Sequence, residues 1–153
     1  MKKFRFPLET VLDYKHQILD ALLGEHARIR ATVTAQEELI LHLELQHMEC
    51  GREYDEKSRE GLSMTEVLLF QNQLNALKRD QKAAEIRLAE LKKLEAAKLA
   101  EVVEAKKEVA SIEKLKEKRL KEYNRMVNKN EETLIDEFVT TERVKEFANS
   151  AAE

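Results

Sequence analysis

A regular apolar spacing between residues 8 and 54 constrains the fold of this chain more than any other sequence feature. Its positions are separated alternately by four and three residues without interruption, and most of them are apolar: Leu8, Leu12, Lys15, Leu19, Leu22, His26, Ile29, Val33, Gln36, Ile40, Leu43, His47, Cys50 and Tyr54. This is the heptad spacing of a coiled coil, in which one face of a helix packs along a partner helix. The spacing continues for roughly seven heptads, whereas an average globular helix has about three turns. The sequence therefore predicts a long helix that packs along a second long helix.

The composition favours helix throughout the chain. Charged residues make up 37 % and aromatic residues 5 % of the 153 residues, with three glycines, one proline and no tryptophan. Chains rich in Ala, Glu, Lys, Leu and Arg with so few helix breakers form long helices and coiled coils, not compact cores or sheets. We therefore expect an all-α protein.

Charge and cysteine content limit the classes of partner. The net charge is −3 with acids and bases interspersed, so no general positive excess favours nucleic acid. The single cysteine, Cys50, cannot form an internal disulfide, which is typical of a reducing compartment. No segment approaches the roughly 20 apolar residues of a membrane span. We expect a cytoplasmic protein that neither enters the membrane nor binds nucleic acid.

Local signals place the helix ends. Pro7 is suited to the first turn of a helix, and the spacing then continues to Tyr54. Gly61 can end a helix in the left-handed conformation, and Ser63-Met-Thr-Glu66 has the form of a capping box that starts the next one. These signals predict a first helix over about 7–57, a turn over about 58–63 and a second helix over about 64–147.

The second helix carries its own heptad positions, namely Val67, Phe70, Leu74, Leu77, Gln81, Ala84, Leu88 and Leu91. After Leu91 the apolar pattern slips and resumes at Leu99, Val102, Val109 and Ile112. The step of eleven residues from Leu91 to Val102 predicts a stutter that locally unwinds the supercoil.

Folding the chain back near residue 61 brings the two patterns into register as an antiparallel coiled-coil hairpin. The pairs include Tyr54 with Val67, Gln36 with Ala84, Leu12 with Val109 and Leu8 with Ile112. We predict one hairpin domain over residues 1–153, monomeric when free, in which residues 113–147 extend beyond the first helix and residues 148–153 are a mobile tail. We call the packed heptad positions of a helix its seam. The alternative is a homodimeric coiled-coil scaffold in which the seam is formed between two copies of the chain.

The overhanging part of the second helix has no predicted partner in the chain. An apolar stripe continues through Leu115, Leu120, Tyr123 and Val127, and bases follow one side at Lys114, Lys118, Lys121 and Arg125. The stripe and the bases suggest a binding surface for an acidic protein. An equal alternative is an ordinary solvated face whose charge is partly neutralised by neighbouring glutamates. A further alternative, an RNA-binding hairpin, is supported only by these basic side chains.

Catalytic and metal chemistry find little support. The glycines are isolated, so no phosphate-binding loop exists, and one cysteine cannot form a thiolate zinc site. Glu44-x-x-His47 and Asp13-x-x-His16 resemble halves of a di-iron pattern, but they lie far apart along the helix. We expect no catalytic residue, no cofactor and no metal site, and hence no enzyme.

The opening motif Phe4-x-Phe6-x-Leu8-x-x-Val11-Leu12-x-x-Lys15 resembles that of the FliJ family, soluble components of the bacterial flagellar type III export apparatus. Tyr54, Phe70 with Leu74 and Leu77, the basic stretch 113–123 and Ile135-Asp-Glu-Phe138 follow in family order. The resemblance covers essentially the whole chain, and it implies a coiled-coil stalk without enzymatic activity that serves flagellum assembly and motility. The equivalent stalk of an injectisome-type secretion system is an alternative.

The resemblance also implies partners and a location. The partners are the export ATPase ring, the membrane export-gate protein and substrate chaperones, at the cytoplasmic face of the inner membrane at the flagellar base. The residues that would face the ATPase are Phe4, Phe6, Leu8, Lys114, Lys118, Lys121, Tyr123 and Phe138. Those that would serve the gate are Tyr54, Phe70, Leu74 and Leu77, although all four also fall on the predicted seam.

Overall fold

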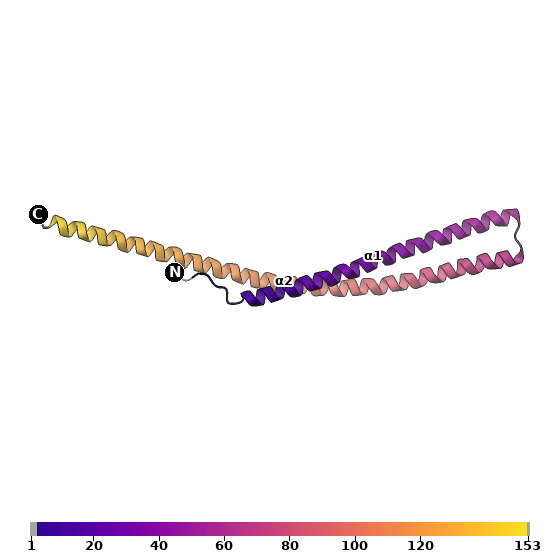
Figure 1. Ribbon diagram of the computed structural model, residues 1–153, viewed down its shortest axis with the longest axis horizontal. Coiled ribbons are helices and arrows are strands. Elements are labelled where there is room, and N and C mark those ends of the chain that lie inside the picture. The colour runs from indigo at the N-terminus through magenta and orange to yellow at the C-terminus, as the bar shows by residue number, and fades with distance from the viewer. Residues whose placement is uncertain (1–2, 153) are drawn as a thin grey trace. The chain divides into compact units, whose positions relative to one another are not determined.

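The computed structural model describes residues 3–152 and contains two helices, α1 (Glu9–Glu60) and α2 (Met64–Ser150), joined by a short turn (Figure 1). No strand occurs among the described residues. The predicted all-α hairpin of two long helices is confirmed, and the predicted helix ends lie within three residues of the observed ones.

The turn between the helices has the predicted chemistry. Gly61 has φ 104°, in the left-handed region where a side chain is strained, and its amide donates to the carbonyl oxygen of Lys57 at 3.0 Å. The amide of Ser63 donates to Oε2 of Glu66 at 3.0 Å, and the amide of Glu66 donates to Oγ of Ser63 at 3.3 Å. This reciprocal pair is the capping box expected from the sequence, and it starts α2.

Helix α1 begins at Glu9, two residues after the proline that was predicted to open it. Pro7 and Leu8 form a turn, in which the amide of Glu9 donates to the carbonyl oxygen of Phe6 at 3.2 Å. The preceding residues have no regular secondary structure. We call residues 3–8 the N-terminal segment.

The chain forms two compact units. The hairpin unit is Gln17–Lys106, and the terminal unit combines Met1–His16 with Lys107–Glu153. Both helices contribute to both units, and each unit is described separately below. The prediction of a single domain stays a prediction.

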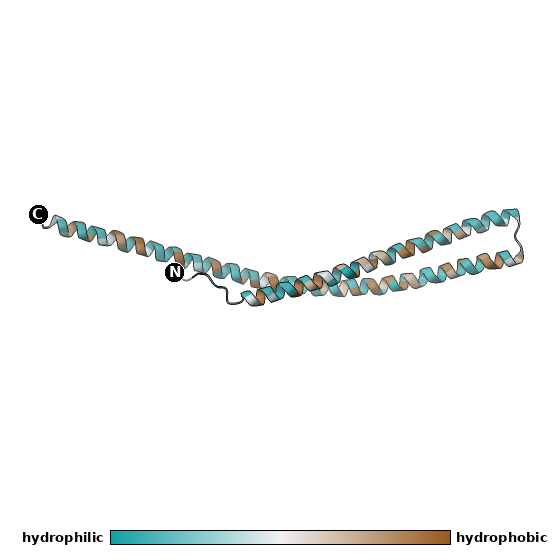
Figure 2. Ribbon diagram, in the orientation of Figure 1, coloured by the Kyte–Doolittle hydropathy of each residue, from teal (hydrophilic) through white to brown (hydrophobic). Residues whose placement is uncertain are grey.

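In the hairpin unit the apolar seam of α1 is confirmed. Its heptad positions are buried or half-buried while most residues between them are exposed, as at Val33, 6 % exposed, and Leu43, 9 % exposed. Nε2 of Gln36 donates to the carbonyl oxygen of Ala84 at 2.9 Å, the pair that the predicted register placed opposite each other. Figure 2 shows apolar residues recurring at intervals along both helices.

The predicted slip after Leu91 is wrong. Leu99 is 47 % exposed, whereas the side chains of Glu95 and Lys98 are only 28 % and 22 % exposed. The seam therefore continues through Leu91, Glu95, Lys98, Val102 and Ala105 with unbroken heptad spacing. Charged side chains occupy two seam positions because acids and bases of α1 lie across from them, so no stutter is needed.

In the terminal unit the start of α1 packs against α2. Leu12 and Val109 are both 5 % exposed, as expected for a facing pair, whereas Leu8 is 37 % exposed at the end of the seam. Two ion pairs flank this contact, between Lys15 and Glu108 at 2.6 Å and between Lys116 and Glu9 at 2.8 Å, and Nε2 of His16 lies 3.2 Å from Oε1 of Glu113.

Beyond Val127 every described residue of α2 is exposed, whereas Lys116, Tyr123 and Val127 of the predicted overhang 113–147 are half-buried. The helix continues to Ser150, into the segment predicted to be a mobile tail. The mobility of residues 148–153 stays a prediction, and Glu153 lies outside the described residues.

Candidate interaction surfaces

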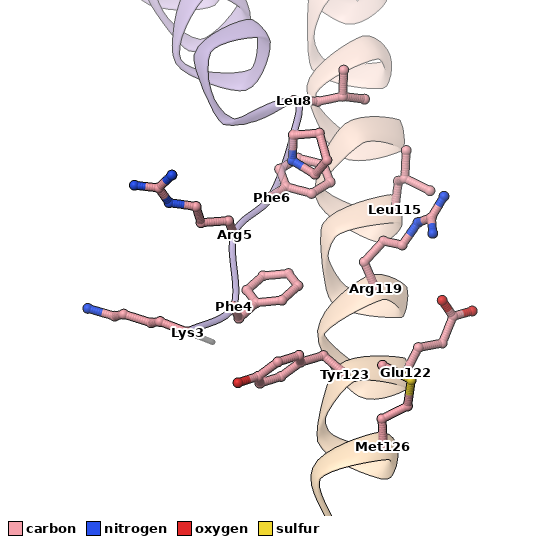
Figure 3. Close-up of a pocket in the computed structure, with 11 residues that line it drawn as sticks. Lys3, Phe4, Arg5, Phe6, Leu8, Leu115, Arg119, Glu122, Tyr123 and Met126 are labelled. Atoms are coloured by element: carbon pink, nitrogen blue, oxygen red, sulfur yellow. The ribbon is translucent and has the colours of Figure 1, made fainter. Parts of the chain in front are cut away.

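The N-terminal segment lies along α2 in the terminal unit (Figure 3). Its side chains alternate: Phe4 and Phe6 point toward α2, whereas Lys3 and Arg5 point away from it. Phe6 is 8 % exposed, and the ring of Phe4 lies 5.5 Å from that of Tyr123 at 51°, a tilted aromatic contact. Two phenylalanines thus attach this segment to α2 while its cationic side chains face solvent.

Beside this contact lies a groove of about 1010 Å³. The N-terminal segment forms one wall, and the other wall is the face of α2 that carries Leu115, Arg119, Glu122, Tyr123 and Met126. Sequence reasoning did not single out Arg119 and Met126. The signal available for them was their spacing of three or four residues from Leu115 and Tyr123, which places all of them on neighbouring faces of one helix.

The residues predicted to face the ATPase fall into two groups. Phe4, Phe6 and Tyr123 are brought together, and they pack the N-terminal segment onto α2. The others are exposed, as is seen for Leu8, for Phe138 at 65 %, and for the lysines at 114, 118 and 121.

The structure does not bring Phe138 to the aromatic contact. It follows Tyr123 by 15 residues on the same helix, which corresponds to about 22 Å at 1.5 Å per residue. Around it the end of α2 presents further apolar side chains that are 43–78 % exposed: Leu134, Ile135, Val139, Val144 and Phe147. Val144 and Phe147 were not anticipated from the sequence, because their spacing from the other apolar positions is irregular.

One of the exposed lysines is paired locally. Nζ of Lys121 lies 2.6 Å from Oε1 of Glu117, one helical turn away. This hydrogen bond and the positive charge hold the pKa of the Glu117 carboxyl below its ordinary value. Lys114 and Lys118 make no ion pair among the described residues.

The residues predicted to serve the export gate lie between the helices of the hairpin unit. The rings of Tyr54 and Phe70 are 5.5 Å apart at 57°, and Nζ of Lys57 lies 5.3 Å from the centre of the Phe70 ring. Leu74 and Leu77 are half-buried. All four therefore pack the hairpin, as their seam positions indicated.

Two shallow grooves border this part of the hairpin unit. One, of about 470 Å³, is lined in part by Leu45, Cys50 and Leu77, and the other, of about 230 Å³, by Leu69 and Phe70. Leu45 and Leu69 are 56 % and 64 % exposed, so they add accessible apolar surface that sequence reasoning had not identified. Burial raises the pKa of the Cys50 thiol, which keeps the thiol protonated.

The described residues contain no group of three or more His, Cys, Asp or Glu side chains that could hold a metal ion. His26 is the exceptional polar side chain of the seam, because its Nε2 is buried without a hydrogen-bond partner. The nearest acid is Glu95, whose Oε1 lies 3.8 Å away, beyond hydrogen-bond distance.

These features define an antiparallel coiled-coil hairpin whose second helix extends past its internal partner. Such a molecule has accessible grooves and an exposed helical end. The family model of the Flagellar FliJ protein matches residues 4–143, nearly the whole chain, and the chain belongs to this family. Neither the comparison with curated proteins nor the comparison with solved structures gave a match.

Membership of the family gives the chain a role in flagellar protein export. Among the described residues, neither helix contains a stretch long and apolar enough to cross a membrane.

Proposed function

We propose that this chain is the non-enzymatic stalk of the flagellar export apparatus. In this proposal the terminal unit binds the ring of the export ATPase, the hairpin unit meets the membrane export gate, and substrate chaperones dock on the same molecule. The proposal combines the family role in flagellar export with the surfaces that each unit leaves exposed. The protein would then work at the cytoplasmic face of the inner membrane.

The exposed end of α2 carries the proposal for the ATPase. From residue 128 onward no described side chain is covered, although Leu134, Ile135 and Phe138 are 62–65 % exposed apolar residues. Apolar side chains exposed along one helix indicate a binding surface when nothing inside the chain buries them. Earlier on the same helix, the exposed lysines at 114, 118 and 121 add charge that suits an acidic surface on the partner.

The seam supports a single chain as the working unit. Gln36 and Ala84 pair within one molecule, and α1 is covered by α2 of the same chain, so the seam is not available to a second copy. This intramolecular pairing favours the stalk over a homodimeric scaffold. Sedimentation equilibrium at micromolar concentration should give the mass of one chain, and a dimer of stable mass would contradict this part of the proposal.

The gate proposal uses the accessible rim of the hairpin. Because Tyr54 and Phe70 pack against each other, their contribution is to position exposed neighbours such as Leu69. Leu69→Ser should weaken binding to the purified cytoplasmic part of the gate protein without lowering the melting temperature. Ser at Leu94, 53 % exposed on the same helix, is the matched control.

The ATPase interaction is tested by charge reversal. Lys118→Glu with Lys121→Glu should weaken association with the export ATPase about tenfold, the effect of losing roughly 1.4 kcal/mol of attraction. The control is Lys78→Glu with Lys82→Glu, which changes the net charge equally on an exposed part of the hairpin unit. Circular dichroism should show equal helicity in both variants.

Equal affinity of the Lys118/Lys121 variant and the control variant for the ATPase would show that this end is not the docking site. Phe138→Ala is a separate probe of the apolar end of α2, because Phe138 is too exposed for its loss to unfold the helix. Its effect on ATPase affinity should add to that of the charge reversals.

A further inference from the structure

The outer face of α2 in the terminal unit carries an unusually pure line of positive charge. Seen down the helix axis, successive residues of an α-helix are 100° apart. On α2, an angular sector about 80° wide contains seven of the residues between 107 and 129. Six of them are basic and the seventh is Ser111; the basic ones are Lys107, Lys114, Lys118, Lys121, Arg125 and Lys129. We call these six residues the basic stripe.

The basic stripe is exposed and free of acids. All six side chains are exposed, and among the described residues only Lys121 makes an ion pair. The four glutamates of the same stretch fall outside the sector, at positions 108, 113, 117 and 122. The stripe therefore presents a nearly uncompensated row of charge about 33 Å long, at 1.5 Å rise per residue.

The stripe also lies on the side of α2 that no other segment among residues 3–152 covers. Val109 and Tyr123, which pack against α1 and the N-terminal segment, are on the opposite side of the helix at the same 100° per residue. A binding partner of the stripe would consequently leave the internal contacts of the terminal unit undisturbed.

The chemistry of the stripe distinguishes between classes of partner. A protein interface normally has an apolar core, and single-stranded nucleic acid is held by aromatic stacking, but the sector contains neither apolar nor aromatic side chains. A flat anionic surface needs neither, because it attracts a straight row of Lys and Arg by charge alone. Aligned bases can all reach such a surface at once.

We propose that the basic stripe binds the anionic phospholipid headgroups of a membrane surface and lays this part of α2 along it. The contact is peripheral and electrostatic, since nothing in the sector can enter the hydrocarbon layer. Lys114, Lys118 and Lys121 are also among the residues proposed for the ATPase, so the membrane and the ATPase are alternative partners at these three lysines. The stripe also extends to Lys107, Arg125 and Lys129, which the ATPase proposal does not use.

The test measures co-sedimentation of the full chain with vesicles of phosphatidylcholine containing 30 % phosphatidylglycerol, and with vesicles of phosphatidylcholine alone, in 50 mM salt. Binding should require the anionic lipid and should fall at least tenfold when the salt is raised to 300 mM. The stripe variant is Lys107→Glu, Arg125→Glu and Lys129→Glu, whose positions lie outside the residues proposed for the ATPase. It should bind at least tenfold more weakly.

The control variant is Lys78→Glu, Lys82→Glu and Lys93→Glu, three exposed bases of the hairpin unit whose reversal changes the net charge by the same amount. It should bind vesicles within twofold of the natural chain, and circular dichroism should show equal helicity in all three proteins.

Three outcomes would overturn the proposal: no binding of the natural chain to anionic vesicles, equal losses in the stripe and control variants, or tighter stripe-dependent binding to single-stranded RNA than to vesicles. The same stripe variant should still bind the export ATPase, so failure of the membrane proposal is distinguishable from failure of the stalk proposal.

Discussion

Leu91 and Leu99 provide a direct test of the packing in the hairpin unit. Both are leucines of α2, and both belong to the apolar pattern read from the sequence. Leu91 is 5 % exposed, whereas Leu99 is 47 % exposed because Lys98 occupies the seam beside it. Replacement of each by alanine should therefore have unequal effects on the free energy of unfolding.

The expected magnitudes follow from burial. Truncation of a buried leucine to alanine costs about 2–5 kcal/mol, and a two-helix seam that can partly collapse belongs at the lower end, about 2–3 kcal/mol for Leu91→Ala. Leu99→Ala removes a side chain that is already half in solvent, so its cost should be about 1 kcal/mol or less. Replacement of leucine by alanine raises the helix propensity slightly and by the same amount at both positions. Helix propensity therefore does not account for the expected difference in the free energy of unfolding.

The assay is urea denaturation followed by circular dichroism at 222 nm. The free energies of unfolding are compared with a common m value, the slope of the free energy against urea concentration. Leu94→Ala, at 53 % exposure, serves as the reference for a surface leucine of the same helix and should resemble Leu99→Ala. Equal destabilisation by Leu91→Ala and Leu99→Ala would refute the continuous heptad and restore the slipped pattern.

Three further predictions concern polar groups and the turn. His26→Leu should raise the melting temperature, because it removes a buried Nε2 that has no hydrogen-bond partner and places an apolar side chain in the seam. The free energy of unfolding obtained from thermal denaturation should rise by about 1 kcal/mol. Gly61→Ala should lower stability by about 1 kcal/mol, since φ 104° strains any side chain, and an unchanged urea midpoint would contradict this. The Lys98 ammonium lowers the pKa of Glu25, and the Glu25 carboxylate raises that of Lys98. Because the pKa of the Glu25 carboxyl is lower in the folded chain than in the unfolded chain, the stability that this pair contributes is present above the ordinary pKa of 4.5. It is lost as the pH falls through the lower pKa of the folded chain. The melting-temperature difference between the natural chain and Lys98→Met should consequently shrink from pH 5 to pH 3, and a constant difference would show that this pair does not respond to acid.

The sequence alone determined the helices and most of their register. The uninterrupted heptad spacing of α1, the Ser63 to Glu66 capping box and the position of Gly61 are local features, and local features survive in any tertiary context that keeps the hairpin. The pairing of Gln36 with Ala84 followed from matching two apolar patterns of similar length.

The candidate surfaces could be predicted only in part. The overhang of α2 and its bases were evident from the sequence, because they lie beyond the point where α1 has residues to pair with them. The aromatic contact of Phe4 with Tyr123 and the adjoining groove were not, since an extended segment of six residues has no periodicity that specifies where it lies. The roles of these residues toward partners stay predictions.

The tertiary structure decided which side chains complete the seam. A pattern of apolar residues favoured Leu99, but the structure places Glu95 and Lys98 there, because Glu25 lies 2.8 Å from Lys98 and Arg30 lies 3.6 Å from Glu95. A charged residue is acceptable at a seam position only when its partner on the other helix is known, and one helix read by itself cannot supply that partner. The spacing of apolar residues therefore determined the hairpin. Charge pairing between the two helices decided that the heptad seam continues without a stutter through Glu95 and Lys98.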